Sequence, residues 1–188
     1  MKTIHGYPFR VLFLCAVLLL NAGCDQASKF IARSQLKGQG TVQVVSSFVV
    51  LAYAENRGAF LGLGSHIPKA LRVILLGAVP LLVLVVLFIY LLRAKDMRLL
   101  TLAGFGCVLG GGIGNIAERL VRGYVVDFLN FGIGRLRTGI LNIADLSVFA
   151  GVIIVAFTMK KHEPPDTGNL STDDGPKPQE FGTDLDNN

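Results

Sequence analysis

The sequence is short of charged residues. Only 16% of its 188 residues are Asp, Glu, Lys or Arg, whereas about a quarter is usual in a soluble domain. Hydrophobic residues make up 52% of the chain. This composition excludes disorder over most of the length. It indicates that lipid, rather than water, is the main solvent of the chain.

Residue types that bind metals are also few and badly spaced for the purpose. The three cysteines, Cys15, Cys24 and Cys107, lie in or beside apolar runs, so neither a disulfide framework nor a CxxC zinc site is indicated. The three histidines are scattered and no HExxH motif occurs, which argues against a zinc protease. These residues indicate neither a metal site nor another cofactor.

Acidic residues are scarce over the first 162 residues, which hold 17 bases and six acids. A basic body points to nucleic acid or to an anionic membrane surface. Because the bases lie between long apolar runs, we expect membrane lipids as partners and no nucleic acid. The six acids are Asp25, Glu55, Asp96, Glu118, Asp127 and Asp145. Residues 163–188 hold seven acids and are rich in Pro, Gly and Asn, which predicts a disordered acidic tail.

Four apolar windows approach the length of about 20 residues that a helix needs to cross the hydrocarbon core. They cover residues 9–31, 70–92, 99–117 and 140–159. Residues 1–162 therefore predict one domain, an all-α membrane protein with a four-transmembrane-helix bundle. Residues 38–64 are rich in β-formers and predict a small extracytoplasmic β-sheet or hairpin.

Four spans place both termini on the same side of the membrane. Arg93, Lys95 and Arg98 crowd the short loop between the second and third windows, which marks that loop as cytoplasmic. The opposite loops also carry bases, so the charge count alone does not decide. We expect both termini in the cytoplasm because the 93–98 loop is short and densely charged.

The first window has a second interpretation. The segment Asn21-Ala22-Gly23-Cys24 follows an apolar run, as in a lipoprotein signal peptide that ends at a lipid-modified cysteine. However, Asn21 stands where such signals usually have Leu, and three more windows follow. A membrane span is therefore favoured.

Two aspartates lie where acids are costly. An Asp at the bilayer centre costs roughly 2.5–3.5 kcal/mol on insertion scales. Asp145 opens the fourth window, and Asn142, three residues earlier, should share its helix face. Asp127 follows the third window within an apolar stretch. If the last two spans are antiparallel neighbours, both carboxyls reach the outer interface, where they can share a proton and activate a water.

Other interpretations stay open for this pair. Asp145 can be a helix-start acid that faces the helix dipole, and Asp127 a loop residue in an Asx turn. Together they can be the ion site of a small transporter or channel. They can also hold helices together in a scaffold protein. Spacing alone does not decide among these.

The third window is rich in glycine, and Gly106, Gly110 and Gly114 predict close helix packing. Asp25 and Lys29, four residues apart, predict an interfacial ion pair worth about 0.2–0.5 kcal/mol. Ser28 and Lys29 are adjacent and point apart on a helix, and no GxSxG elbow occurs. A serine hydrolase is therefore not indicated.

Five short blocks occur in order along the chain. They are Asp25-Gln26-Ala27-Ser28-Lys29, Asn56-Arg57-Gly58-Ala59-Phe60, Gly111-Gly112-Ile113-Gly114-Asn115-Ile116-Ala117-Glu118-Arg119, Val126-Asp127-Phe128 and Asn142-Ile143-Ala144-Asp145. Together they resemble the sequence blocks of lipoprotein signal peptidase (signal peptidase II). Glu118 stands where that family usually has Asp, Leu141 replaces a common Phe, and the acidic tail is an addition.

The resemblance implies an intramembrane aspartic endopeptidase of the bacterial inner (cytoplasmic) membrane, with its active site near the outer interface. Such an enzyme removes signal peptides from prolipoproteins by cleaving N-terminal to a diacylglyceryl-modified cysteine, and the cyclic peptide globomycin inhibits it. The resemblance implies Asp127 and Asp145 as the catalytic dyad. Residues that match positions for substrate binding and support are Asp25, Lys29, Asn56, Asn115, Arg119 and Asn142.

Overall fold

The computed structural model describes residues 6–58, 64, 66–94 and 97–159. Its helices are α1 (Tyr7–Leu36), α2 (Lys69–Val73), the π-helical turn η2 (Ile74–Ala78), α3 (Val79–Arg93), α4 (Leu99–Arg122) and α5 (Ile143–Met159). Its strands are β1 (Val42–Val45), β2 (Val49–Asn56), β3 (Val125–Ile133) and β4 (Leu136–Arg137). The predicted tail, residues 163–188, lies outside the described residues.

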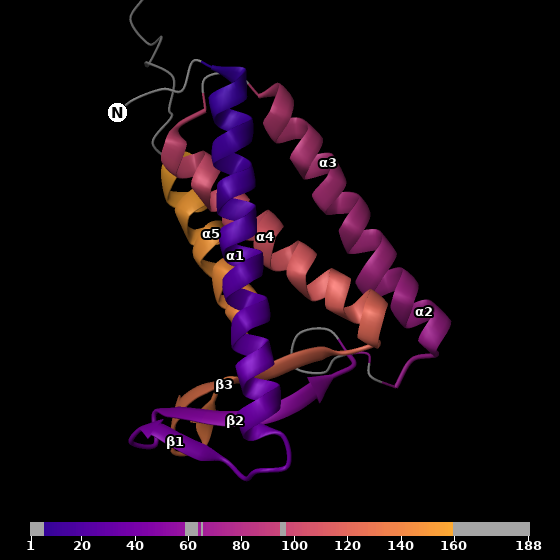
Figure 1. Cartoon of the computed structure of the whole chain (residues 1–188), viewed down its shortest axis with the longest axis vertical. Coiled ribbons are helices and arrows are strands. Elements are labelled where there is room, and N and C mark those ends of the chain that lie inside the picture. The colour runs from indigo at the N-terminus through magenta and orange to yellow at the C-terminus, as the bar shows by residue number, and fades with distance from the viewer. Residues whose placement is uncertain (1–5, 59–63, 65, 95–96, 160–188) are drawn as a thin grey trace, which may run out of the picture.

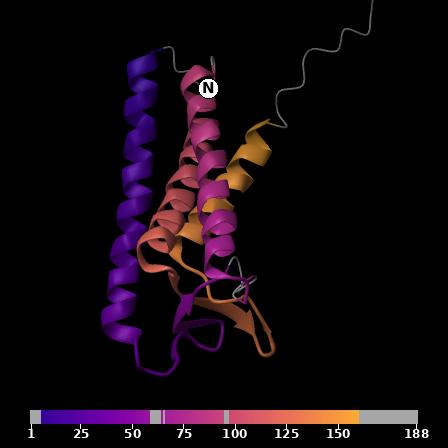
Figure 2. The same ribbon diagram turned by 90° about the vertical axis from the view of Figure 1, so that its right-hand side faces the viewer.

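The described residues contain three helices that are long and apolar enough to cross a membrane: Tyr7–Leu36, Lys69–Arg93 and Leu99–Arg122. These helices contain the first three predicted windows. The fourth window is represented by α5, an apolar helix of 17 residues. The structure thus confirms a mostly helical membrane protein with a small sheet. Helix α1 starts at the end of the bundle opposite the sheet (Figures 1 and 2).

Two helices extend beyond the windows that hydrophobicity predicted. The last turns of α1 pack on the sheet, where Ala32 and Leu36 form a buried cluster with Val126 and Phe128. Helix α4 continues to Arg122 and ends at Gly123, whose positive φ of 78° suits a glycine C-cap. Contacts with the sheet and a cap, rather than apolar length, therefore set these two ends.

The helix after residue 68 is irregular near its start. The π-helical turn Ile74–Ala78 comes just before Pro80. Proline has no N–H to donate to the carbonyl four residues back, so the regular hydrogen-bond ladder is interrupted there. The irregularity lies in the part of this helix that lines the cavity described below.

Helix α4 packs through two rows of glycine. A Cβ on Gly106, Gly110 or Gly114 would meet side chains of α1, which confirms close packing by this predicted row. A second row, Gly104 and Gly111, lies against α5, where Cβ atoms would meet backbone oxygens. Because both neighbours approach so closely, α4 fixes the position of α1 relative to α5.

The sheet is larger than predicted. It has four antiparallel strands in the order β1-β2-β3-β4, and only the first two fall in the predicted segment 38–64. Of the interpretations left open for Asp127, the structure excludes the loop residue in an Asx turn, because Asp127 lies in β3 opposite Ala54 of β2. The first four residues of β3 are all buried, Asp127 included, so its sequence does not alternate between buried apolar and exposed polar residues.

Candidate active site

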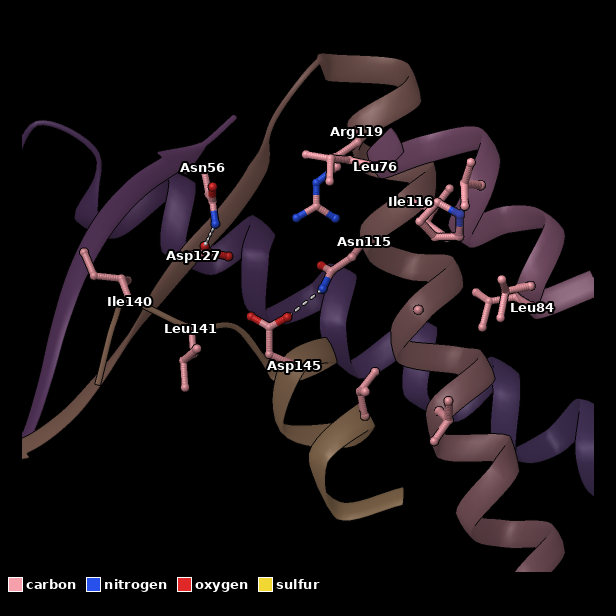
Figure 3. Close-up of a pocket in the computed structure, with 16 residues that line it drawn as sticks. Asn56, Leu76, Leu84, Asn115, Ile116, Arg119, Asp127, Ile140, Leu141 and Asp145 are labelled. Atoms are coloured by element: carbon pink, nitrogen blue, oxygen red, sulfur yellow. Dashed lines mark hydrogen bonds between the residues drawn. The ribbon is translucent and has the colours of Figure 1, made fainter. Parts of the chain in front are cut away.

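A cavity of about 510 Å³ lies where the helices meet the sheet (Figure 3). Most of its lining is apolar and comes from the helix after residue 68, from α4 and from the start of α5. The polar residues that face it are Asn56, Asn115, Arg119, Asp127 and Asp145. All five belong to the set that the sequence predicted. The structure therefore brings both aspartates to one cavity, from a strand and from a helix.

Asp127 is held by two amide side chains. Its Oδ2 accepts a hydrogen bond from Asn56 Nδ2 at 2.9 Å, and its Oδ1 accepts one from Asn142 Nδ2 at 2.6 Å. The side chain is only 2% exposed. Burial raises the pKa of the Asp127 carboxyl to about 6, although both amides oppose the rise; the nearby charge of Asp145 adds to it. This carboxyl can therefore exchange a proton near neutral pH.

Asp145 is fixed by the start of its own helix. Asn142 Oδ1 accepts a hydrogen bond from Asp145 N at 2.9 Å, and Asp145 Oδ2 accepts one from Asn142 N at 3.2 Å. This reciprocal pair is a capping box. We predicted that both side chains project from one helix face, but Asn142 precedes the helix and caps it. Asp145 Oδ1 remains available and accepts from Asn115 Nδ2 at 2.9 Å.

Asn142 connects the two acids. Its amide nitrogen donates to Asp127 Oδ1, and also to Asn115 Oδ1 at 3.2 Å. The residue is fully buried. One side chain thus contacts Asp127 directly and Asp145 through the capping box, so their relative position depends on a single amide.

Behind the cavity lies a buried cluster of charges. Lys29 Nζ is 2.8 Å from Asp25 Oδ2, 3.0 Å from Glu118 Oε2 and 2.8 Å from Asn115 Oδ1. We predicted an interfacial ion pair between Asp25 and Lys29, but both residues are 0% exposed. The pair is therefore part of the protein interior, and losing Lys29 would leave the buried Asp25 carboxylate without this counterion.

This cluster orients Asn115. Its Oδ1 accepts hydrogen bonds from Lys29 and Asn142, which leaves its Nδ2 to donate to Asp145. Asp25 supports the same region, because its Oδ1 accepts from the backbone N–H of Ala144 at 3.0 Å. Asp25 therefore holds the start of α5, and Lys29 holds the Asn115 side chain that binds Asp145.

Arg119 and Asn56 lie at the sheet side of the cavity (Figure 3). Arg119 Nη2 donates to the carbonyl oxygen of Gly58 at 3.2 Å, and Asn56 Oδ1 accepts from Gly58 N at 3.0 Å. The segment after β2 is thus tied both to α4 and to the residue that binds Asp127. The guanidinium places a positive charge beside the two carboxyls.

Glu118 has a larger structural role than its sequence position suggested. Its Oε1 pairs with Arg33, and its Oε2 accepts from the backbone N–H of Val126 at 3.3 Å, next to Asp127. Sequence reasoning noted Glu118 only as one of six scarce acids and as a departure from the family pattern, and it missed Arg33. The one available signal was the scarcity of acids.

The arrangement suits acid–base chemistry on a buried bond. Two carboxyls share one cavity, one of them with a pKa near 6, and amides fix both. Among the residues that the structure describes, no group of three or more His, Cys, Asp or Glu side chains is placed to hold a metal ion. The two carboxyls of the described site can each donate or accept a proton.

Comparisons with known proteins identify the family of the chain. A sequence model of signal peptidase (SPase) II matches residues 17–161. The chain belongs to the signal peptidase II family. The lipoprotein signal peptidase of Francisella tularensis subsp. novicida is 32% identical over 153 residues, which cover 79% of this chain and 93% of that protein. That of Moorella thermoacetica is 34% identical over 147 residues, covering 78% and 91%.

Solved structures agree on the fold. A bacterial membrane enzyme determined by the in meso method at 2.3 Å has a TM-score of 0.68 at 24% identity, over 93% of this chain and 99% of that one. A second, at 1.9 Å, has a TM-score of 0.66 at 23% identity. The sequence matches confirm the predicted membership of the signal peptidase II family. This signal peptidase II chain is a protease and a bacterial multi-pass membrane protein.

Proposed function

We propose that Asp127 and Asp145 are the catalytic dyad with which this peptidase removes signal peptides from prolipoproteins. The proposal is carried by one observation: the two carboxyls face the same largely apolar cavity, and each is held by an amide side chain. An acid that shares an apolar site with a second acid retains a proton at pH values where an isolated carboxyl has lost it.

The reaction follows from these two protonation states. The ionised carboxyl takes a proton from a water molecule, whose oxygen attacks the carbonyl carbon of the scissile bond. The protonated carboxyl gives its proton to the carbonyl oxygen. When the tetrahedral intermediate breaks, the C–N bond opens and the nitrogen of the leaving segment takes up a proton from the dyad. Each carboxyl alternates between donor and acceptor, so no metal or cofactor is required.

The remaining polar residues position these groups. Asn56 and Asn142 hold Asp127, and Asn115 holds Asp145, with Lys29 fixing the Asn115 amide and Asp25 the start of α5. Arg119 faces the cavity and supplies a positive charge for the carbonyl oxygen as negative charge develops on it. The same amides can bind the backbone of an extended substrate segment.

The apolar lining of the cavity supports a substrate that lies in the membrane. A signal helix with a diacylglyceryl-modified cysteine is already in the bilayer, so it can enter the apolar cavity sideways, between the helix after residue 68 and α5. Cleavage then falls N-terminal to the modified cysteine. The cyclic peptide globomycin would inhibit by occupying the same cavity. Bilayer lipids would contact the exposed apolar side chains of the helices.

Placement in the membrane completes the proposal. Helix α5 is the fourth span of a four-helix bundle in the inner membrane, with both termini in the cytoplasm. The sheet and the dyad then lie at the outer interface, where water is available for hydrolysis. The 17 residues of α5 are enough for a span of the shortest kind.

The proposal is tested with purified full-length protein and a diacylglyceryl-prolipoprotein. Asp127→Asn and Asp145→Asn should each abolish processing while thermal unfolding stays near that of the parent protein. Glu55→Gln is the matched control, because this carboxylate lies on β2 outside the cavity and pairs with Lys37. Ion flux in vesicles without cleavage would favour a transporter. Unfolding of both Asn variants would favour a scaffold protein.

A further inference from the structure

A second cavity, of about 380 Å³, lies between the start of the helix after residue 68 and the C-terminal end of α4. All charged residues in its described lining are basic: Arg57, Lys69, Arg72, Arg119 and Arg122. α2 begins and α4 ends at the end of the bundle that carries the sheet (Figure 1), and residues from both line this cavity. In a membrane this level is the interface, where lipid headgroups lie.

Three of the five bases make short contacts with other parts of the described structure. Arg72 and Arg119 donate to backbone carbonyl oxygens, at 3.4 and 3.2 Å. Arg122 Nε lies 3.7 Å from Glu118 Oε1, but Glu118 already pairs more closely with Lys29 and Arg33. Five basic residues and no acidic residue form the charged part of the described lining, so the cavity favours an anion.

Most of the other lining residues are apolar. Val73, Leu76 and Gly77 come from the first turns of the helix after residue 68, and Leu120 and Val121 from α4. Several of these side chains are exposed outward, including Val121 at 83%. A ligand that fits both parts has an anionic head and apolar chains. A soluble anion or an acidic peptide would leave the apolar part unused.

We propose that this cavity holds the phosphate of an anionic phospholipid, with the acyl chains along α2, η2 and the end of α4. Guanidinium and ammonium groups donate charge-assisted hydrogen bonds to phosphate oxygens, and basic pockets between membrane helices suit anionic headgroups. The lipid site goes beyond the peptidase activity and does not depend on the identity of the dyad.

The two cavities share Leu76 and Arg119. Within the described part of the chain, the buried Nε of Arg119 has no hydrogen-bond partner. A phosphate in the basic cavity can accept from this atom and so restrict the guanidinium that also faces Asp127 and Asp145. A bound lipid would thus restrict the motion of Arg119 at the edge of the catalytic cavity.

The test is a titration of phosphatidylglycerol into the full-length protein held in phosphatidylcholine nanodiscs, with bound lipid counted by native mass spectrometry. The double variant Lys69→Gln/Arg72→Gln should weaken the first binding step roughly 25-fold, at about fivefold for each base near an anionic headgroup. Lys69→Arg/Arg72→Lys should retain binding. The matched control is Arg93→Gln/Arg98→Gln, which also removes two positive charges. Arg93 is the last residue of α3 and Arg98 is the N-cap of α4, so both lie far from the basic cavity.

The proposal is overturned if the two glutamine double variants lose the first lipid equally, or if Lys69→Gln/Arg72→Gln binds like the parent protein. A site for free anions predicts that inorganic phosphate displaces the lipid at the concentration at which it binds the protein alone. A site for the substrate predicts that Lys69→Gln/Arg72→Gln raises KM for substrates with acidic residues after the cysteine, with lipid binding unchanged. Either result also contradicts a lipid site. Lipid counting does not require cleavage, so an inactive dyad would not affect the result.

Discussion

Asn142 donates from its side chain to Asp127 and to Asn115, and its backbone N–H donates to Asp145. The residue is buried and makes no use of solvent. In a medium of low polarity each of these hydrogen bonds is strong, and each would be costly to leave unmade. The geometry of the two acids thus depends on neutral amides, which can bind a carboxyl in either protonation state.

Asn56 sets the proton affinity of Asp127. Its hydrogen bond favours the ionised carboxyl and so lowers a pKa that burial has raised to about 6. Asn56→Ala should therefore shift the limb of the kcat/KM–pH profile that reports Asp127 to higher pH. The control is Asn130→Ala on the same strand, whose amide binds backbone oxygens instead. A shift to lower pH, or an equal shift in the control, would contradict this assignment.

Lys29 is the counterion of two buried acids. Removing one member of a buried ion pair costs about 3–5 kcal/mol, because the partner is left charged and unpaired. Lys29→Met should therefore lower the unfolding free energy by about that amount and remove activity as well. Denaturant unfolding in detergent measures it. Lys37→Met, which removes a pair exposed at the surface, should leave the midpoint unchanged. Similar midpoints for the two variants would show that the Lys29 cluster is solvated.

Sequence reasoning identified Lys29 but not its surroundings. An acid and a base four residues apart have the same spacing on an exposed helix face and in a protein interior. The difference lies in Glu118 and Asn115, which come from α4 and complete the coordination of the ammonium group. Contacts between residues so far apart in the chain do not follow from local spacing.

At the scale of elements, apolar length predicted the helices well and the strands poorly. The windows at 9–31, 70–92 and 99–117 lie within helices because a continuous apolar run of that length has few other solutions in a bilayer. β3 was missed because its first four residues are all buried, so its sequence shows no alternation between apolar and polar side chains. A short apolar run is compatible with either a strand or a helix end, and only pairing with β2 resolves it.

Gly111 joins the packing of helices to the chemistry of the site. A Cβ at this position would meet the carbonyl oxygen of Ala144, the residue before Asp145. Gly111→Ala should therefore push the start of α5 away, destabilise the protein by about 1–3 kcal/mol and reduce kcat/KM. Processing and thermal unfolding assays measure the two effects.

Gly23→Ala is the matched control, because a Cβ there meets nothing within 4 Å. Alanine is also the better helix former, so this change should be neutral or slightly stabilising. Equal behaviour of the two variants would mean that the α4–α5 contact has room for a methyl group.

For the whole molecule, the described helices meet the sheet at one end, and the proposed orientation places that end outside. With Cys15, Cys24 and Cys107 replaced by alanine, a single cysteine at Val44 reports the sheet side, since Val44 is 57% exposed in β1. A membrane-impermeant maleimide should label Val44→Cys when only the outer membrane is opened. Arg93→Cys should react only after the inner membrane is opened. The reverse pattern would invert the topology.

The family and its fold could be inferred from five short blocks, because their order along the chain carries information that no single block has. The way in which the site residues come together around the cavity could not be inferred. It depends on strand pairing that places Asp127 opposite Ala54 and on the glycine contacts that bring α5 to α4. Both are properties of the assembled molecule.

The central claim is that Asp127 and Asp145 act as one unit, and the most direct test is kcat/KM for Asp127→Asn, Asp145→Asn and the double variant on one diacylglyceryl-prolipoprotein. Residues that share one chemical step are non-additive, because losing either already removes the step. We predict that each single variant falls to the residual rate and that the double variant falls no further. Substantial activity in either single variant, or losses that multiply in the double variant, would contradict a shared catalytic role.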